Sequence, residues 1–244
     1  MTDQSKNAQD LNGLQFYVSP SHDCSYLNEQ HAITLFADPT SLLNNSQYQT
    51  LSKIGFRRSG EHIYRPHCSD CTACIPVRLT VNDFKPNRNQ RRILKLNSNI
   101  KVTVCNSDFS DEHYRLYQRY IKSRHPGGGM DDDDVKSYKS FITSSWSDTY
   151  LYEFRIDSKL VAIAVTDHLN DSISAVYTFF DPNYSKNSLG VYSVLWQIEY
   201  GVKNKLLWLY LGYWIKDCKK MSYKDNYRPI EYFDGTNWNT LSDK

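Results

Sequence analysis

Three cysteines stand at a spacing that suits metal or cluster chemistry. Cys68, Cys71 and Cys74 form a C-x2-C-x2-C pattern, and His67 precedes the first of them. As thiolates they could bind zinc or an iron–sulfur cluster, with Cys24, which also lies in a turn-like segment, as a remote fourth ligand. The alternative is a set of reduced thiols packed in a small loop, because cysteine is among the most often buried residue types. The spacing alone is compatible with both.

Arginines flank the cysteine loop on both sides. A guanidinium group is a planar fork that matches a carboxylate bidentately, so Arg57, Arg65 or Arg78 could read an acidic side chain of a substrate. The alternative is that these arginines form ion pairs within the chain, for which the nearest acids in sequence are Asp23, Glu29, Glu61 and Asp70.

A second group of cations lies on one face of a helix predicted over residues 87–96. Its members are three and four residues apart and are Arg88, Arg91, Arg92 and Lys95. From Lys85 to Lys101 the chain has six basic residues and no acidic one. An ordinary solvated helix face is the alternative, but the lack of compensating acids favours contacts with phosphates.

The bulk composition limits what such a patch can be. The 244 residues include 29 basic and 27 acidic side chains, and the net charge of +2 excludes a general nucleic-acid coat. The first 13 residues are polar without a signal or transit pattern, and the apolar run 160–165 is too short to span a bilayer. We therefore expect a cytoplasmic protein without membrane contact, in which the cysteines are thiols or metal ligands.

Hydrophobic periodicity and turn residues predict the elements that must position these groups. Helices are predicted over 29–36, from Ser41 to Ile54 with Gly55 as the stop, and over 87–96, 110–125 and about 190–203. Strands are predicted over 63–66, 75–81, 100–105, 150–156, 160–168, 173–180 and 206–211.

The order of these elements predicts an α+β fold with a mixed sheet. The strands between 150 and 180 form an antiparallel meander, and the strand–helix–strand unit that follows requires a parallel crossover. The N-terminus of its helix points toward splayed strand ends, where anions and polar ligands bind. We expect a disordered lead-in over 1–13, a Cys/Arg-rich domain over 14–125, a flexible joint over 126–134 and a second domain over 135–244.

Familiar catalytic motifs are absent from the sequence. There is no Ser-His-Asp order, no G-x-S-x-G, no P-loop and no G-x-G-x-x-G, so hydrolase, kinase and dehydrogenase chemistry have no support. Several other strings, taken together, resemble the aminoacyl-tRNA–protein transferase family over about residues 23–238. They are DCSYL (23–27), GFRRSG (55–60), YRPHC (64–68), CTACIPVR (71–78), NQRR (89–92), SAVYTFFDP (174–182), SLG (188–190), YLGYWI (210–215) and MSYK (221–224).

The compact length and the cysteine loop resemble the bacterial branch of that family. This resemblance implies transfer of leucine from leucyl-tRNA to proteins with N-terminal Asp or Glu, which marks them for N-end-rule degradation. It also implies a GCN5-type N-acetyltransferase-like fold for the second domain, and we expect a monomer. Eukaryotic relatives have a Cys-x-x-Cys pair where this chain has Cys24 and Leu27, which argues against an iron–sulfur site shared with them.

Three alternatives to leucyl transfer remain open. One is an arginyl-tRNA–protein transferase with the same acceptors. Another, of a different class, is a non-catalytic module that binds tRNA or senses metal. The third is a CoA-dependent N-acyltransferase, although the loop before Ser188 lacks the glycine-rich pyrophosphate cradle that such an enzyme needs.

The implied reaction, aminolysis of an aminoacyl ester, requires no cofactor. Holding the amine and the ester in line can supply about 7–11 kcal/mol of the barrier reduction. As a hypothesis, Asp167 or Tyr177 handles the amine, and backbone N–H groups of Ser188, Leu189 and Gly190 face the oxyanion or the 3′ adenosine. In the same hypothesis an arginine near the cysteine loop reads the acidic N-terminus, and the basic helix face holds the tRNA.

Overall fold

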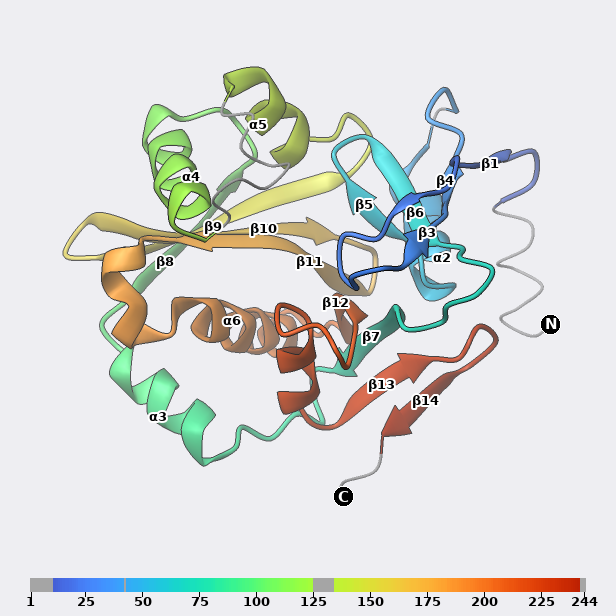
Figure 1. The fold of residues 1–244 in the computed structure, drawn as a ribbon. Coiled ribbons are helices and arrows are strands. Elements are labelled where there is room, and N and C mark those ends of the chain that lie inside the picture. The colour runs from blue at the N-terminus through green and yellow to red at the C-terminus, as the bar shows by residue number, and fades with distance from the viewer. Residues whose placement is uncertain (1–10, 42, 125–133, 242–244) are drawn as a thin grey trace.

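The computed structural model describes residues 11–41, 43–124 and 134–241 (Figure 1). The N-terminal part forms an antiparallel four-stranded sheet in the order β1-β4-β6-β5 and a two-stranded ribbon of β2 and β3. The bounds of these strands are Phe16–Val18 (β1), His22–Asp23 (β2), His31–Ala32 (β3), Thr34–Ala37 (β4), Arg57–Ser59 (β5) and His62–Pro66 (β6).

The helix predicted over residues 29–36 is wrong, because this segment forms β3 and β4. Ile33, Thr34 and Phe36 are β-branched or aromatic residues that favour a strand. Pairing decides the outcome, because β4 lies between β1 and β6 and hydrogen-bonds to both. Tertiary pairing of this kind overrides the weak helical signal of a short segment.

Helix α2 (Asn45–Lys53) begins later than predicted, with Asn44 and not Ser41 as its N-cap. The side chain of Asn44 accepts a hydrogen bond from the backbone N–H of Gln47, and the Gln47 side chain accepts one from the backbone N–H of Asn44. This reciprocal capping box satisfies two N–H groups that the first turn would leave unpaired. The predicted stop is confirmed, since Gly55 follows the helix with a φ of 88°.

The rest of the chain builds an eight-stranded mixed sheet in the order β14-β13-β7-β12-β11-β10-β9-β8. The strands predicted over 75–81, 100–105, 150–156, 160–168, 173–180 and 206–211 are confirmed, with small shifts of their ends. The observed bounds are Ile75–Thr80 (β7), Lys101–Asn106 (β8), Asp148–Ile156 (β9), Lys159–His168 (β10), Ser172–Phe180 (β11), Trp208–Trp214 (β12), Ile230–Phe233 (β13) and Trp238–Leu241 (β14).

Strands from both sides of the expected joint share this sheet. β7 pairs with β12 and β13, and β8 pairs with β9. The joint itself lies outside the described residues except for Asp134, whose side chain accepts from the backbone N–H of Ser137 at the start of helix α5. The division into two domains at this point stays a prediction.

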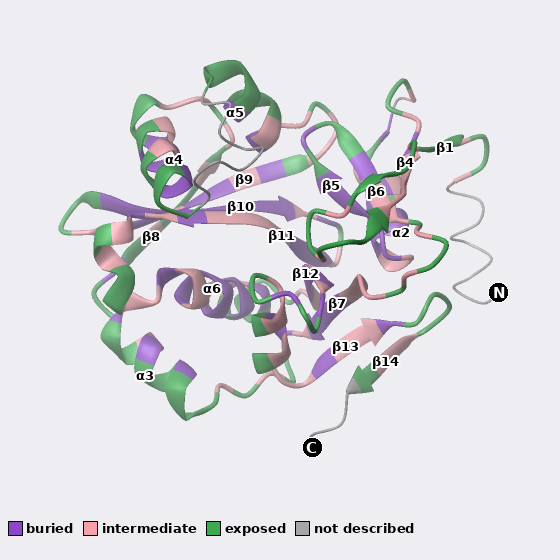
Figure 2. Cartoon of the chain, in the orientation of Figure 1, coloured by how far each residue is buried: buried purple, intermediate pink, exposed green. Residues whose placement is uncertain are grey.

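Helices cover both faces of the large sheet (Figures 1 and 2). The first face carries α6 and α3, and the other carries α4 and α5. Their bounds are Arg88–Leu96 (α3), Asp111–Arg124 (α4), Val135–Ile142 (α5) and Leu189–Lys203 (α6), with short 3-10 helices η1 (Pro182–Asn187) and η2 (Ser222–Asn226) beside them. The α+β class and the mixed sheet are therefore confirmed.

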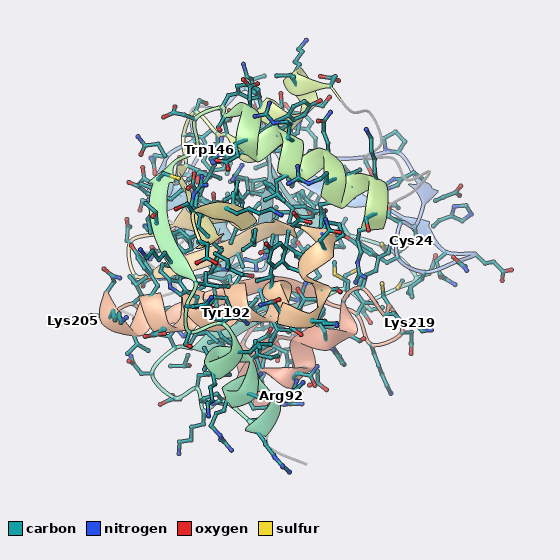
Figure 3. The ribbon with its side chains drawn as sticks, turned by 90° about the vertical axis from the view of Figure 1, so that its left-hand side faces the viewer. Cys24, Arg92, Trp146, Tyr192, Lys205 and Lys219 are labelled. Carbon is teal, nitrogen blue, oxygen red and sulfur yellow. The ribbon has the colours of Figure 1, made fainter. Side chains whose placement is uncertain are left out.

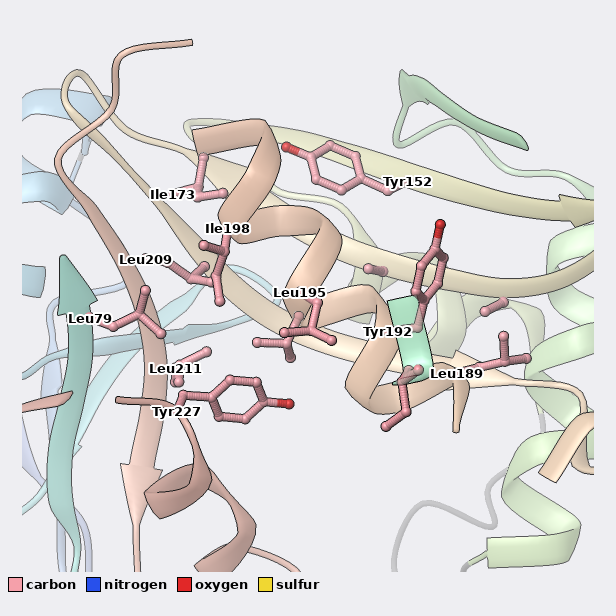
Figure 4. Packing of buried hydrophobic residues seen from close by; sticks show 14 of the residues in the cluster. Leu79, Tyr152, Ile173, Leu189, Tyr192, Leu195, Ile198, Leu209, Leu211 and Tyr227 are labelled. Carbon is pink, nitrogen blue, oxygen red and sulfur yellow. The ribbon is translucent and has the colours of Figure 1, made fainter. Parts of the chain in front are cut away.

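The core lies between α6 and the sheet (Figure 4). Leu195 and Ile198 of α6 are 3% and 4% exposed and pack against Leu209 and Leu211 of β12. Full burial of each such side chain contributes about 1.5–3 kcal/mol. β10 is buried on both faces, because its alternating residues contact α6 on one side and α4 on the other. The centre of the sheet is therefore packed on both faces. None of the described helices has the length and apolar character to cross a membrane.

Candidate functional site

β11 and β12 part after a short stretch of pairing. These two parallel strands pair only at three positions, from Ser172 opposite Trp208 to Ser174 opposite Tyr210. Beyond that point β11 continues to Phe180 against β10, while β12 continues to Trp214 against β7. The predicted parallel crossover is thus confirmed. Splayed parallel strands leave ladder groups free at the carboxyl ends, which is where α/β sheets bind ligands.

The N-terminus of α6 lies beside the end of β11. A Cβ atom on Gly190 would lie 3.3 Å from the Phe180 ring, so the first turn of the helix packs on the last residue of the strand. Ser188 adopts a left-handed conformation and makes no side-chain cap, and within the described residues the backbone N–H groups of Leu189 and Gly190 have no acceptor. Such N–H groups favour a negative charge. The predicted role of residues 188–190 in holding the oxyanion or the 3′ adenosine stays a prediction.

Tyr177 is half-buried on β11 and packs against Tyr120 of α4 and Phe141 of α5. Burial, followed by the neighbouring Tyr120 and Tyr117, raises the pKa of its hydroxyl well above the ordinary value. A phenol with a raised pKa does not act as a base near neutral pH, but it can donate a hydrogen bond or relay a proton. The contribution that Tyr177 can make to the amine is therefore limited to these two.

Asp167 lies in a closed network of buried side chains. Its carboxylate accepts two hydrogen bonds of 2.7 Å from the guanidinium of Arg58, and both side chains are fully buried. Tyr48 donates to Oδ2 at 2.9 Å, and Thr149 donates to Oδ1 at 2.7 Å. A carboxylate with four donors and no exposure has no route to a substrate amine. This geometry favours a structural role for Asp167 over the catalytic role expected from its place at a strand end.

The three arginines proposed to read an acid lie in different environments. Arg78 is occupied, because its Nε donates to Glu231 at 2.6 Å and its guanidinium lies 4.3 Å from the ring centres of both Trp208 and Trp238. Arg65 is half-buried, donates to the carbonyl of Ile54 at 3.3 Å and covers a phenylalanine ring. Arg78 also lies against the ring of Tyr210, which Arg57 contacts as well, whereas Arg65 does not share that ring.

Arg57 differs from both because it is buried without an acidic partner in the described part of the chain. It is 6% exposed, and its Nη1 donates to the Ser174 hydroxyl at 3.3 Å, at the point where β11 and β12 part. Its Nη2 is buried and has no hydrogen-bond acceptor among the described residues. A second buried cation, Lys224 of η2, lies close to it and was not singled out as a site residue from the sequence. A lysine within an aromatic segment gives no local signal that it will be buried.

The four cysteines of the sequence pattern do come together. Cys24, Cys68, Cys71 and Cys74 line one cavity of about 460 Å³ beside the small sheet. Burial, and then the neighbouring thiols, raise the pKa of Cys74 to about 12. Among the described residues, however, no three His, Cys, Asp or Glu side chains are arranged so that they could share one ion. Zinc or an iron–sulfur cluster at the cysteines stays a prediction.

The basic face of α3 is exposed on the side of the molecule away from α4 and α5 (Figures 1 and 3). A capping box at Asn87 and Gln90 begins the helix, and Gln90 and Ile93 are its buried residues. The four predicted cations are exposed, and none has a carboxylate within ion-pair distance in the part of the chain that the structure describes. The helix and its charged face are confirmed, and binding of tRNA there stays a prediction.

Comparisons with known proteins match this chain almost from end to end. Two family models match it, described as the N terminus and the C terminus of arginine-tRNA-protein transferase, over residues 22–92 and 112–234. Curated relatives named aspartate/glutamate leucyltransferase include those of Hahella chejuensis and Alcanivorax borkumensis. The first is 49% identical over 95% of this chain and 99% of the relative, and the second is 50% identical over 96% and 97%.

Solved structures give lower similarities. The crystal structure of FemX covers 90% of this chain and 84% of its own, with 10% identity and a TM-score of 0.47. A C-terminal domain of a lysylphosphatidylglycerol synthetase from Agrobacterium fabrum covers 68% of this chain and 51% of its own, with 10% identity and a TM-score of 0.44. The matched family models and the near full-length identity to the leucyltransferases show that the chain belongs to the aminoacyl-tRNA–protein transferase family, in its bacterial branch.

Proposed function

We propose that this protein transfers leucine from leucyl-tRNA to the α-amino group of proteins whose first residue is Asp or Glu. The observation that carries the proposal is the identity of 49% and 50% to aspartate/glutamate leucyltransferases over nearly the whole of both chains. The parting of β11 and β12 beside the N-terminus of α6 supports it, because splayed strand ends and free helix N–H groups bind polar and anionic ligands. In the cytoplasm such transfer would mark the acceptor for N-end-rule degradation.

The reaction is balanced without a covalent enzyme intermediate. The lone pair of the α-amine attacks the ester carbonyl, a C–N bond forms, and the C–O bond to the terminal ribose of the tRNA breaks. One proton leaves the amine, and the ribose oxygen takes up one. The chemistry requires no cofactor, so a metal at the cysteines would serve structure or redox control. Metal analysis of anaerobically purified protein, with Cys71→Ser as the comparison, tests that prediction.

The chain can lower the barrier of this reaction in two ways. The first-turn N–H groups of α6 are candidates to stabilise the developing oxyanion, and loss of one such donor costs roughly 10²–10³ in kcat. Tyr177 can relay the proton of the amine, because its protonated hydroxyl can both donate and accept a hydrogen bond. A Tyr177→Phe variant that folds normally and keeps its kcat would exclude this second role.

One assay separates the proposed function from its rivals. The protein is incubated with leucyl-tRNA, arginyl-tRNA or acetyl-CoA and with peptides that begin with Asp, Glu, Lys or Ala, and the products are weighed. We expect a leucine mass on the Asp and Glu peptides only. An arginine mass would establish the arginyl activity that the family-model descriptions name. Absence of product with every donor would favour a binding module.

A further inference from the structure

Two cations are buried side by side with no acid among the described residues to neutralise them. Arg57 of β5 and Lys224 of η2 are each 6% exposed. Neither has an ion-pair partner in the described part of the chain, and Arg57 Nη2 has no hydrogen-bond acceptor there. The next residue, Arg58, is also buried but is neutralised by Asp167. Charged side chains are almost never buried unpaired, so this pair of cations needs an explanation.

The two cations converge at a bulge in β12, next to the point where β11 and β12 part. A Cβ atom added to Gly212 would lie 3.4 Å from Lys224 Nζ and 3.7 Å from both Nε and Nη2 of Arg57. Gly212 has a φ of 83°, and the pairing of β12 with β7 shifts by one residue between Tyr210 and Gly212. Tyr210 is also the last residue that pairs with β11. The cations therefore lie beside the position where the two strands part.

We propose that Arg57 and Lys224 form the binding site for the side-chain carboxylate of the acceptor's N-terminal Asp or Glu. This assignment rests on the proposed function and deepens it. A carboxylate supplies two acceptors that match the fork of Arg57, including the unpartnered Nη2, and it faces the ammonium of Lys224 at the same time. The same charges repel the ammonium group of the leucyl donor, so the site distinguishes the acceptor from the donor.

A structural role is the competing explanation for Lys224. Its Nζ donates to the carbonyl of Tyr213 at 2.6 Å, and Tyr213 lies opposite Pro76, which has no N–H to offer. That role accounts for a donor at position 224 but not for a positive charge there. It also leaves the buried, unpartnered Nη2 of Arg57 unexplained. A substitution that keeps the donor and removes the charge therefore separates the two roles.

Lys224→Gln is that substitution, because the amide can still donate to the carbonyl of Tyr213. Lys220→Gln is the matched control, since Lys220 is exposed and lies shortly before η2 in the same segment. Binding of peptides that begin with Asp, Glu, Asn or Gln is measured by calorimetry without tRNA, and leucyl transfer to the same peptides is measured separately. Arg57→Lys is examined in parallel, because it retains a cation and loses the fork.

We expect wild-type protein to bind Asp and Glu peptides more tightly than Asn and Gln peptides. In Lys224→Gln this preference should fall about 10- to 150-fold, the value of one hydrogen bond to a charged group, while Asn and Gln binding stays unchanged. Arg57→Lys should weaken the preference in the same direction. The control should match wild type in all four peptides.

An unchanged preference in Lys224→Gln, or an equal loss for acidic and amide peptides, would overturn the proposal. The calorimetric arm separates it from the proposed function. Charge-dependent peptide binding with no leucyl transfer would refute the transferase activity and support the carboxylate site. If the protein transfers leucine to Asp and Glu peptides but Lys224→Gln leaves the preference for them intact, the transferase activity is supported and the carboxylate site is refuted. Thermal unfolding of each variant identifies any that fails to fold, and Arg57→Lys then decides alone.

Discussion

At the scale of single residues, the two adjacent arginines of β5 differ in whether an acidic side chain neutralises them. Arg58 is bound by Asp167 in a closed network that also includes Tyr48 and Thr149. Arg57 points to the other side of the strand, as neighbours in a strand do, and reaches Ser174. Buried ion pairs hold a fold in register only while both partners are present. The ion pair of Arg58 therefore holds β5 in the position from which Arg57 can contact a ligand.

The first prediction concerns Asp167→Asn. Breaking a buried ion pair by removing one partner leaves an uncompensated charge and costs about 3–5 kcal/mol of the free energy of unfolding. We expect a loss of this size in chemical denaturation, with little change in kcat for the molecules that remain folded. Asp157→Asn in the exposed turn before β10 is the control and should be neutral. A stable Asp167→Asn protein with a kcat lowered a hundredfold would restore the catalytic role.

The second prediction concerns Lys224 and pH. Burial, and next the charge of Arg57, lower the pKa of Lys224 from 10.5 to about 7 in the folded protein. Between pH 7 and pH 10.5, Lys224 is protonated in the unfolded chain and has largely lost its proton in the folded protein. The free energy of unfolding of the wild type therefore rises with pH over this range. Below about pH 7 both states are protonated, and the full penalty of the buried charge is present.

Lys224→Met removes that penalty together with the hydrogen bond to Tyr213. The melting temperature of the variant minus that of wild type should therefore be larger at pH 6 than at pH 9. The other groups around the ammonium are Arg57, the Tyr223 ring and the thiols of Cys74 and Cys218. Cys74 stays protonated over this range, because its own pKa is about 12. A difference that does not vary between pH 6 and pH 9 would show that Lys224 keeps its proton in the folded protein over this range, as it does in the unfolded chain.

At the scale of elements, the nine residues of α3 form one buried face and one exposed face. Ile93 and Gln90 anchor the helix, and Gln90 donates to the carbonyl of Asn226 at the end of η2. The opposite face presents Arg88, Arg91, Arg92 and Lys95 to solvent. Figure 3 shows Arg92 of this face at the surface. Because its buried residues anchor α3 to the rest of the protein, the backbone positions of the four cations are fixed, and the cations can contact successive phosphates.

The third prediction tests that patch. Replacing its four cations by Gln should raise KM for leucyl-tRNA about tenfold or more and leave binding of acceptor peptides unchanged. Removing each cation that binds a phosphate should flatten the slope of log K against log salt by about 0.7–0.9. Lys136→Gln on α5, which covers the opposite face of the sheet (Figure 1), is the single-charge control. An unaltered salt slope would place the tRNA elsewhere.

At the scale of the whole molecule, the large sheet joins distant parts of the chain. β7 is inserted between β12 and β13, which come much later in the sequence, and it positions both Arg78 and the bulge at Gly212. The region where β11 and β12 part is therefore built from the N-terminal and C-terminal parts together. Arg57 comes from the small sheet, Ser174 and Tyr210 from the large one, and Lys224 from η2.

The fourth prediction follows from that shared sheet. Fragments 1–125 and 134–244, expressed separately, should each lack cooperative unfolding, because removal of β7 leaves β12 and β13 with unpaired edges and an open core. Mixing the two during refolding should restore a single transition and leucyl transfer. Circular dichroism and thermal melts check this. A cooperative transition in fragment 134–244 alone would establish the second domain as an independent unit.

The sequence by itself determined the elements whose signals are local. The alternation in β7, the apolar and aromatic runs of β9, β10 and β11, and the helix α3 depend on neighbours within a few residues, so their prediction succeeded. The segment 29–36 failed, because its strand depends on pairing with β1 and β6. The family resemblance, with motifs spread over most of the chain, correctly indicated the reaction class before any tertiary contact was known.

Tertiary structure alone decided which charged residues are neutralised. Arg57, Arg58 and Arg78 look equivalent in sequence, yet Asp167 neutralises Arg58, and Glu231 with two tryptophans holds Arg78. Asp167 lies 109 residues from Arg58 and Glu231 lies 153 residues from Arg78, so spacing carries no information about either pair. Lys224 became a candidate only because folding placed it, buried, beside Arg57. Burial sets the cost of a charge, and burial is a property of the assembled fold.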